Sequence, residues 1–289
     1  MPRTVDMPKK LMELIGAVEE LPTLPDIVLR ISRMTVSPQT NAADIGRLIS
    51  NDPALSSKVL RLVNSAYYGF PRKIASVTKA IVLLGFNKVK NMAISASVAD
   101  LFSGAVTEGF SFKQYWHHAV AAAIAGELLA KRLAPQRADD AFVGGLLSEI
   151  GKVMVVSLAP DIYAQVLREA RTESNDLRSA ETRALGSDFC ANGAMLAETW
   201  QFPDSLVRVI RHFRDPDQCR EDRPLLDLVH VASALAWALG HPGAAETLVP
   251  TLRGSAFRNL KVTESLLAEV GAEFMRQWAL AGALLEMAQ

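Results

Sequence analysis

Apolar side chains recur every three or four residues along most of the chain, which is the spacing of one face of an α-helix. No run of alternating apolar and polar residues bounded by turn residues predicts a strand. The repeats predict helices over residues 11–18, 27–34, 42–49, 53–63, 77–84, 87–101, 111–133, 137–158, 160–171, 177–184, 188–200, 204–213, 224–239, 244–252 and 263–287. The predicted fold class is therefore all-α, with the helices arranged in two lobes.

Several of these helices carry clear start or stop signals. Asp52 precedes Pro53, and an aspartate accepts hydrogen bonds from the free amides of a first helical turn, where proline also fits. Ser76 is in the same position before the helix over 77–84. The segment Leu21-Pro22-Thr23-Leu24-Pro25 interrupts the helical pattern, because each proline restricts its own backbone and that of its predecessor.

Composition restricts the class of protein further. Apolar residues make up 49% of the 289 residues and charged residues 21%, which is typical of a globular protein and excludes a disordered chain. Lys plus Arg and Asp plus Glu each number 31, so the formal net charge is zero, which argues against a globally basic nucleic-acid binder. The two cysteines, Cys190 and Cys219, cannot form a disulfide framework or a cysteine-rich zinc site.

Neither a signal peptide nor a membrane span is predicted. The N-terminal segment has no uninterrupted apolar core before Glu13. The chain also lacks a run of about 18 consecutive apolar residues. We therefore expect a soluble, cytoplasmic protein that does not insert into membranes.

One segment has a strongly one-sided charge. From Pro53 to Ala99 there is no acidic residue. The basic residues in this segment are Lys58, Arg61, Arg72, Lys73, Lys79, Lys88 and Lys90. Two interpretations remain open: a solvated surface that faces a more acidic second lobe, or a surface that binds an anionic partner such as a protein, a nucleotide or a nucleic acid.

Several separated blocks of the sequence, in the expected order, resemble the HDOD family, the HD-related output domains of bacterial signalling proteins. These blocks are residues 21–25, 49–55, 59–68, 74–85, Trp116, 141–147, 150–152, 193–196, Trp200 and Pro203. The resemblance covers about 16–216. It implies a short lead-in over 1–15, an N-terminal lobe over about 16–105 and an HD-like lobe over about 106–216. The helices of 217–289 are expected to pack on the HD-like lobe.

The resemblance also implies a metal site that can be checked position by position. HD phosphohydrolases bind a divalent metal through a first histidine, an adjacent His-Asp pair and a later aspartate, and many relatives add further histidines. The matching positions here carry His118, Ser148, Glu149, Phe189, Phe213, Arg214 and Ser233. A catalytic metal site needs at least three protein ligands and an open position. We therefore predict no metal, no cofactor and no catalytic residues, with His118 as a buried, hydrogen-bonded histidine and Glu149 paired with Lys152 or Arg214.

A surface for a partner is the remaining candidate site. Tyr67 and Tyr68 are expected either to pack against the loop that follows them or to form, with Asn64, a recognition surface between the lobes. The possible partner-binding residues are Asn64, Tyr67, Tyr68, Arg72, Lys73, Lys79, Lys88 and Lys90.

These observations lead to one predicted function and two alternatives. The predicted function is a non-catalytic signal-transduction output or scaffolding protein, which binds a protein partner or a small signal such as a nucleotide in the bacterial cytoplasm. One alternative is a regulator that binds a nucleotide or a nucleic acid through the basic N-terminal lobe. The other is a residual HD-type phosphohydrolase, against which the replaced ligands argue.

Overall fold

The computed structural model describes residues 10–11, 22–34, 42–172, 176–246 and 248–288. These residues are mostly helical, and the only β-type pairing among them is an isolated bridge between Thr107 and Phe110. The predicted all-α class is therefore confirmed for the described part of the chain. The first predicted helix, 11–18, falls almost entirely outside the described residues.

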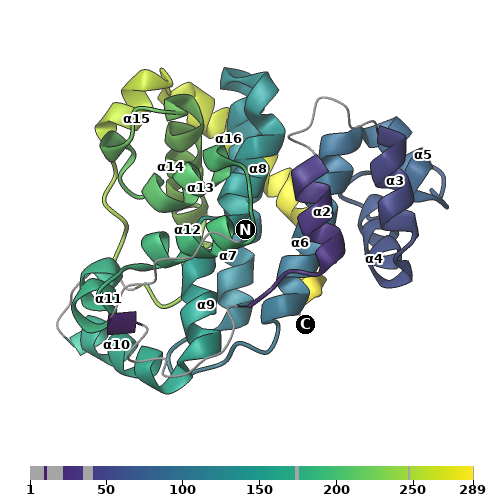
Figure 1. Cartoon of the computed structure of the whole chain (residues 1–289). Coiled ribbons are helices and arrows are strands. Elements are labelled where there is room, and N and C mark those ends of the chain that lie inside the picture. The colour runs from purple at the N-terminus through teal and green to yellow at the C-terminus, as the bar shows by residue number, and fades with distance from the viewer. Residues whose placement is uncertain (1–9, 12–21, 35–41, 173–175, 247, 289) are drawn as a thin grey trace.

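The N-terminal lobe contains the helices α2 (Asp26–Met34), α3 (Ala42–Ser50), α4 (Pro53–Val63), α5 (Val77–Leu84) and α6 (Phe86–Phe102). The predicted caps are present, since Asp52 accepts a hydrogen bond from the Leu55 amide at 2.9 Å and Ser76 accepts one from the Lys79 amide at 3.3 Å. Helices α3, α4 and α5 lie together at one end of the molecule, and α6 connects them to the second lobe (Figure 1).

The HD-like lobe and its continuation contain α7 (Phe112–Leu133), α8 (Ala138–Leu147), α9 (Ile150–Leu158), α10 (Pro160–Thr172), α11 (Leu177–Leu185), α12 (Phe189–Thr199), α13 (Asp204–His212) and α14 (Arg223–Ala238). Short 3-10 turns occupy η1 (Pro135–Arg137) and η2 (Pro216–Gln218). Helix α7 lies near the centre of the molecule (Figure 1) and packs against α8, α14 and the C-terminal α16.

Two glycines allow the helices of this lobe to approach closely. A Cβ atom on Gly145 of α8 would lie 2.5 Å from the Ala122 carbonyl oxygen of α7. A Cβ atom on Gly151 of α9 would lie 2.0 Å from the Phe189 carbonyl oxygen of α12. Because both neighbours are backbone atoms, a larger residue at either position would push a helix away.

The chain ends in α15 (Gly254–Asn259), α16 (Glu264–Leu280), α17 (Gly282–Leu285) and the 3-10 turn η3 (Glu286–Ala288). Helix α16 packs against α7, whereas α17 also contacts α4 and η3 contacts α6. The buried Trp116 indole of α7 donates a hydrogen bond to the Leu284 carbonyl at 2.8 Å. The C-terminal segment therefore contacts both lobes.

Three predicted helices differ from the structure. The described residues within 244–252 are irregular rather than helical, with Ala245 at a φ of 64°, and α15 begins only at Gly254. The predicted helix over 137–158 is divided at Ser148 and Glu149, where a turn separates α8 from α9. The last predicted helix stops at Leu280, before α17. The first two breaks place charged side chains in the interior, as the next subsection shows.

One stretch in the described part of the chain, Pro135–Leu158, is long and apolar enough to cross a membrane by length and composition alone, with a mean hydropathy of 1.6. However, 89% of that apolar window is buried inside the protein. Core helices of soluble proteins have the same composition, and here the stretch is the close-packed α8–α9 pair.

Candidate functional site

His118 lies in the middle of α7, with no exposed surface. Its Nδ1 atom is 2.7 Å from the His241 carbonyl oxygen, and since a carbonyl only accepts, Nδ1 carries the proton. The other ring nitrogen, Nε2, is 3.4 Å from the Ser233 hydroxyl and 3.5 Å from a Glu149 carboxylate oxygen. The sequence analysis matched both His118 and Ser233 to metal-ligand positions. In the structure, the His118 imidazole and the Ser233 hydroxyl both make contacts within the protein.

Glu149 lies in the turn between α8 and α9 and is 2% exposed. Its carboxylate accepts hydrogen bonds from Lys152 Nζ at 2.8 Å and from Arg214 Nη2 at 2.5 Å, which confirms both predicted pairings. Burial alone would raise the pKa of Glu149, but the positive charges of Lys152 and Arg214, with the nearby His118 ring, outweigh it and lower this pKa to about 2. The carboxylate therefore stays ionised in the interior.

A second carboxylate, Glu246, enters the same interior from the irregular segment before α15. Its oxygens are 2.8 Å from Arg214 Nη2, and one lies 3.3 Å from Lys152 Nζ. The Trp237 indole also donates to Glu246 at 3.4 Å. The sequence analysis missed this residue, because the pattern over 244–252 predicts a helix and no motif marks the carboxylate.

We call Glu149, Lys152, Arg214, Glu246 and His118 the buried ion cluster. Two lysine or arginine charges face two glutamate charges, so the cluster is balanced when the His118 ring is neutral. Aromatic rings cover the cations: Lys152 Nζ is 4.4 Å from the Phe189 ring centre, and the Arg214 guanidinium is 5.1 Å from that of Phe213. Phe189 and Phe213 thus shield the cluster.

These residues do not fit a divalent metal ion. The oxygens of Glu149 already bind two cationic side chains, and the Ser148 hydroxyl donates to the Gly145 carbonyl at 2.9 Å. The part of the chain that the structure describes contains no group of three or more His, Cys, Asp or Glu side chains arranged to hold a metal. Lys152 and Arg214 instead supply the positive charge beside the carboxylates, where they would repel a metal ion.

The predicted recognition residues of the N-terminal lobe are partly used within the chain. The Asn64 side chain makes three hydrogen bonds, to the Leu60 carbonyl and to both backbone groups of Ile74, so it fixes the intervening loop. The Tyr67 hydroxyl lies 3.4 Å from Glu127 and 3.2 Å from Gln277, and the Tyr68 ring packs edge-on against Tyr67 at 5.0 Å. Tyr67 thus connects the N-terminal lobe with α7 and α16.

The seven basic residues between Pro53 and Ala99 fall into two groups. Three interact with acidic residues. Lys58 pairs with Asp100, and Lys88 pairs with Glu127 and Asp139. Lys90 lies near Asp139 and Asp140, and burial lowers the pKa of its ammonium group. The other four form no ion pair with any residue that the structure describes, and all four are exposed: Arg61, Arg72, Lys73 and Lys79. Lys58, Lys88 and Lys90 thus face acidic residues of the same chain, whereas a surface that binds an anionic partner stays a prediction for the other four residues.

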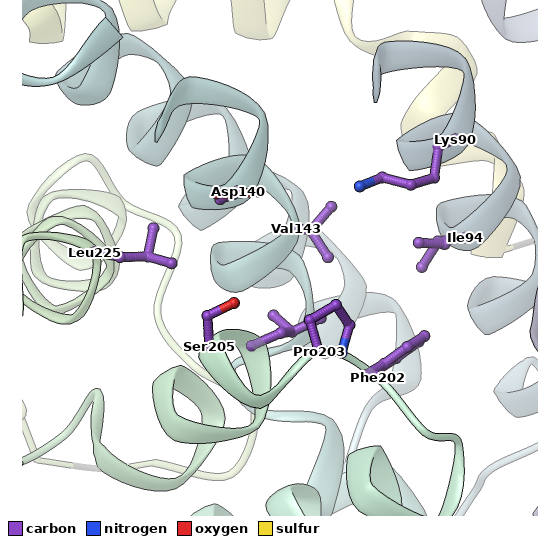
Figure 2. Close-up of a pocket in the computed structure, with 9 residues that line it drawn as sticks. Lys90, Ile94, Asp140, Val143, Phe202, Pro203, Ser205 and Leu225 are labelled. Atoms are coloured by element: carbon purple, nitrogen blue, oxygen red, sulfur yellow. The ribbon is translucent and has the colours of Figure 1, made fainter. Parts of the chain in front are cut away.

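A small pocket lies where the two lobes meet (Figure 2). Lys90 and Ile94 of α6 face Val143 of α8 across it, and residues 202–206 close the other side. It encloses about 430 Å³ of empty space, part of which is open to solvent. The lining is mainly apolar, and its charged side chains are Lys90 and Asp140.

The fold and the site define an all-α protein of two lobes with a buried ion cluster in its second lobe. Residues 21–216 match the family model of the HDOD domain. The chain therefore belongs to the HDOD family, as the sequence motifs predicted.

Similar proteins extend this comparison. An uncharacterized protein of Treponema pallidum is 28% identical over 239 residues, which is 80% of this chain, but the chain spans only 46% of that relative. A solved HDOD domain protein of unknown function from Geobacter sulfurreducens superposes with a TM-score of 0.80 at 23% identity, covering 95% of this chain and 97% of that one. A candidate phosphohydrolase from Shewanella amazonensis superposes with a TM-score of 0.71 at 25% identity, with 97% of each chain covered.

Proposed function

We propose that this protein is a non-catalytic signal-transduction output or scaffolding module of the bacterial cytoplasm, which acts by binding a protein partner or a small signal. The observation that carries the proposal is the buried ion cluster. Glu149, at a position where the resemblance implies a metal ligand, is paired with Lys152 and Arg214, and Glu246 pairs with the same two cations.

The charge balance of the cluster supports a structural role for it. A divalent ion bound to Glu149 would add two positive charges beside two buried cations that Phe189 and Phe213 cover. Displacing those cations would leave them unpaired in the interior, which typically costs several kcal/mol. A metal that activates water also needs an open coordination position, and the cluster fills that space with side chains.

The similarity to the Shewanella amazonensis protein supports a shared fold. It does not support phosphohydrolase activity for this chain. Phosphohydrolase chemistry of the HD type depends on particular ligands, and five of the matching positions here are Ser148, Glu149, Phe189, Phe213 and Ser233. Function is therefore argued from the residues present, and these favour binding.

The test is a search for hydrolysis and for metal binding in the same preparation. The purified chain is incubated with Mn²⁺, Fe²⁺ or Mg²⁺ and with p-nitrophenyl phosphate, bis-p-nitrophenyl phosphate and a panel of linear and cyclic nucleotides. We expect no product above the protein-free blank and no stoichiometric metal by elemental analysis. Metal-dependent turnover that disappears in a folded His118→Ala variant would overturn the proposal.

One specific observation favours a second candidate function. Arg72, Lys73 and Lys79 are exposed and have no ion-pair partner among the described residues, which favours an anionic ligand of the N-terminal lobe. If that ligand is a nucleic acid, its affinity should fall steeply with salt, because each phosphate contact releases bound counterions. Direct binding of labelled oligonucleotides at several salt concentrations separates this function from recognition of a protein.

A further inference from the structure

A wide groove runs along one side of α4 in the N-terminal lobe, away from the buried ion cluster. It encloses about 1390 Å³ of empty space, much of it open to solvent, and its lining includes Ser56, Ser57, Leu60, Arg61, Lys73 and Ile74. Helix α4 forms one wall, and the chain segment before α5 forms the other. The groove lies at the end of the molecule formed by α3, α4 and α5 (Figure 1), and nothing in the HD-like lobe lines it.

The walls of the groove are held in place from within. The Asn64 side chain accepts a hydrogen bond from the Ile74 amide at 2.7 Å and donates to the Ile74 carbonyl at 2.9 Å. It also donates to the Leu60 carbonyl of α4 at 2.7 Å, so one side chain joins the two walls. Because the groove is already formed, a ligand would not need to order its walls on binding.

The charge of the groove is positive and uncompensated. Arg61 and Lys73 are exposed on its two walls, and neither forms an ion pair with a residue that the structure describes. The acidic residues on either side of the Pro53 to Ala99 segment do not pair with Arg61 or Lys73. Asp52 caps α4, and Asp100 pairs with Lys58. An anionic group that enters the groove would therefore meet two free cations.

The remaining lining indicates which kind of anion fits. Leu60 and Pro53 offer apolar surface beside the cations, and Ser56 and Ser57 offer hydroxyl groups, whereas the Ile74 side chain is buried in the core. This mixture matches an extended peptide whose carboxylates alternate with apolar side chains. A nucleic acid fits less well, because its affinity depends largely on the number of phosphate contacts that lysine and arginine side chains make. The segment from Pro53 to Ala99 presents only four exposed, unpaired cations, and its tyrosines 67 and 68 are half-buried.

We propose that this groove binds an acidic, partly apolar segment of a partner protein, with its carboxylates on Arg61 and Lys73. The inference rests on the proposed function, because it identifies the surface through which a binding module would act. It concerns a different part of the molecule from the ion cluster, so the two can fail separately.

The experiment measures fluorescence anisotropy of labelled probes with the full chain. The probe is a fluorescein-labelled peptide in which Glu and Asp alternate with Leu; a peptide with Gln and Asn in place of the acids and a single-stranded oligonucleotide serve for comparison. The test variant is Arg61→Glu with Lys73→Glu. The matched control reverses two exposed charges elsewhere, Arg220→Glu with Lys261→Glu, and so changes the net charge equally.

We expect the acidic peptide to bind the unmodified chain and the control variant alike, and to bind the groove variant at least about tenfold more weakly. We also expect its affinity to fall as salt rises from about 50 mM to about 300 mM, since exposed charges are screened. Unchanged binding by a folded groove variant, equal binding of the neutral peptide, or no binding of the acidic peptide would overturn the proposal.

If the oligonucleotide binds more tightly than the acidic peptide, and binding depends on Arg61 and Lys73, the proposed peptide ligand is wrong. The groove would then bind a nucleic acid. Each of these results leaves the non-catalytic function standing. Conversely, metal-dependent hydrolysis would overturn that function while peptide binding in the groove could still be observed. The thermal unfolding midpoint of each variant checks that a loss of binding is not a loss of folding.

Discussion

The buried ion cluster makes a quantitative prediction for Glu149→Gln. Glutamine has nearly the shape of glutamate, so the substitution removes a charge without opening a cavity. Lys152 and Arg214 would then face Glu246 alone, and the interior would carry one uncompensated positive charge. The variant should therefore unfold at a clearly lower denaturant concentration than the unmodified chain.

The size of the effect follows from the titration of the same carboxyl. Its pKa falls from the usual 4.5 to about 2 in the folded protein. Because a pKa shift of one unit corresponds to about 1.4 kcal/mol, the ionised carboxylate contributes about 3 kcal/mol to the free energy of unfolding at neutral pH. Removing one partner of a buried ion pair typically costs about 3–5 kcal/mol, which agrees with this value.

The pH dependence has a definite sign. A carboxyl whose folded pKa is lowered contributes its full stabilisation above the unfolded pKa of 4.5 and loses it as the pH falls toward about 2. Glutamine does not titrate, so the difference between the two proteins should be largest near pH 7 and should shrink below pH 4.5. The stability of the unmodified chain should fall more steeply with acid than that of the variant.

Urea unfolding followed by tryptophan fluorescence measures this difference, because Trp116 and Trp200 are buried in the fold. The matched control is Glu221→Gln, whose side chain is 75% exposed and pairs with Arg208 at 3.3 Å. It should change the free energy of unfolding by less than about 1 kcal/mol. The reasoning is refuted if Glu149→Gln is as stable as the control, or if its deficit is the same at pH 7 and at about pH 3, where less than about half of the stabilisation should remain.

Further predictions concern other buried groups. His118→Ala should lower the free energy of unfolding by about 1–3 kcal/mol in a urea titration and leave partner binding intact, because its ring only makes internal hydrogen bonds. Gly151→Ala should prevent soluble expression or cost more than about 3 kcal/mol, whereas Gly282→Ala, with no atom within 4 Å of the added Cβ, should leave the thermal midpoint nearly unchanged. Cys219 should react with a thiol reagent in the native protein before Cys190, because burial raises the pKa of the Cys190 thiol; equal rates would contradict this.

Local signals in the sequence explain which helices it predicts correctly. Asp52, Pro53 and Ser76 determine helix starts through hydrogen bonds to amides within one turn, so their effect is independent of the distant chain. The segment 244–252 shows where such signals fail. Its apolar spacing favours a helix, yet the chain remains irregular there and Glu246 reaches Arg214 and Lys152. Tertiary ion pairing thus overrides the local preference, and no short-range pattern contains that information.

The candidate site was predictable to a similar extent. Sequence motifs place His118 and Glu149 at HD positions, but they do not show which carboxylates neutralise which cations. Lys88 pairs with Glu127 and Lys58 with Asp100, 39 and 42 residues away in sequence. Only the fold distinguishes these neutralised lysines from exposed cations such as Arg61. The net charge of a segment therefore overstates the surface available to an anionic partner, and burial and pairing must be known first.

The cluster also explains why the HD-like lobe and the C-terminal segment must be considered together. His118 and Glu149 lie inside the part of the chain that matches the HDOD domain, whereas Ser233, His241 and Glu246 lie beyond residue 216. Each of these later residues contacts a position that the family motif would assign to metal binding. With its carboxylates and cations paired in this way, the buried ion cluster holds separate helices together, whereas Arg61, Arg72, Lys73 and Lys79 of the N-terminal lobe are exposed and form no ion pair with a described residue. An interaction that depends on charge should therefore respond to substitutions at Arg61 or Lys73 far more than to any substitution in the pocket that leaves the protein folded.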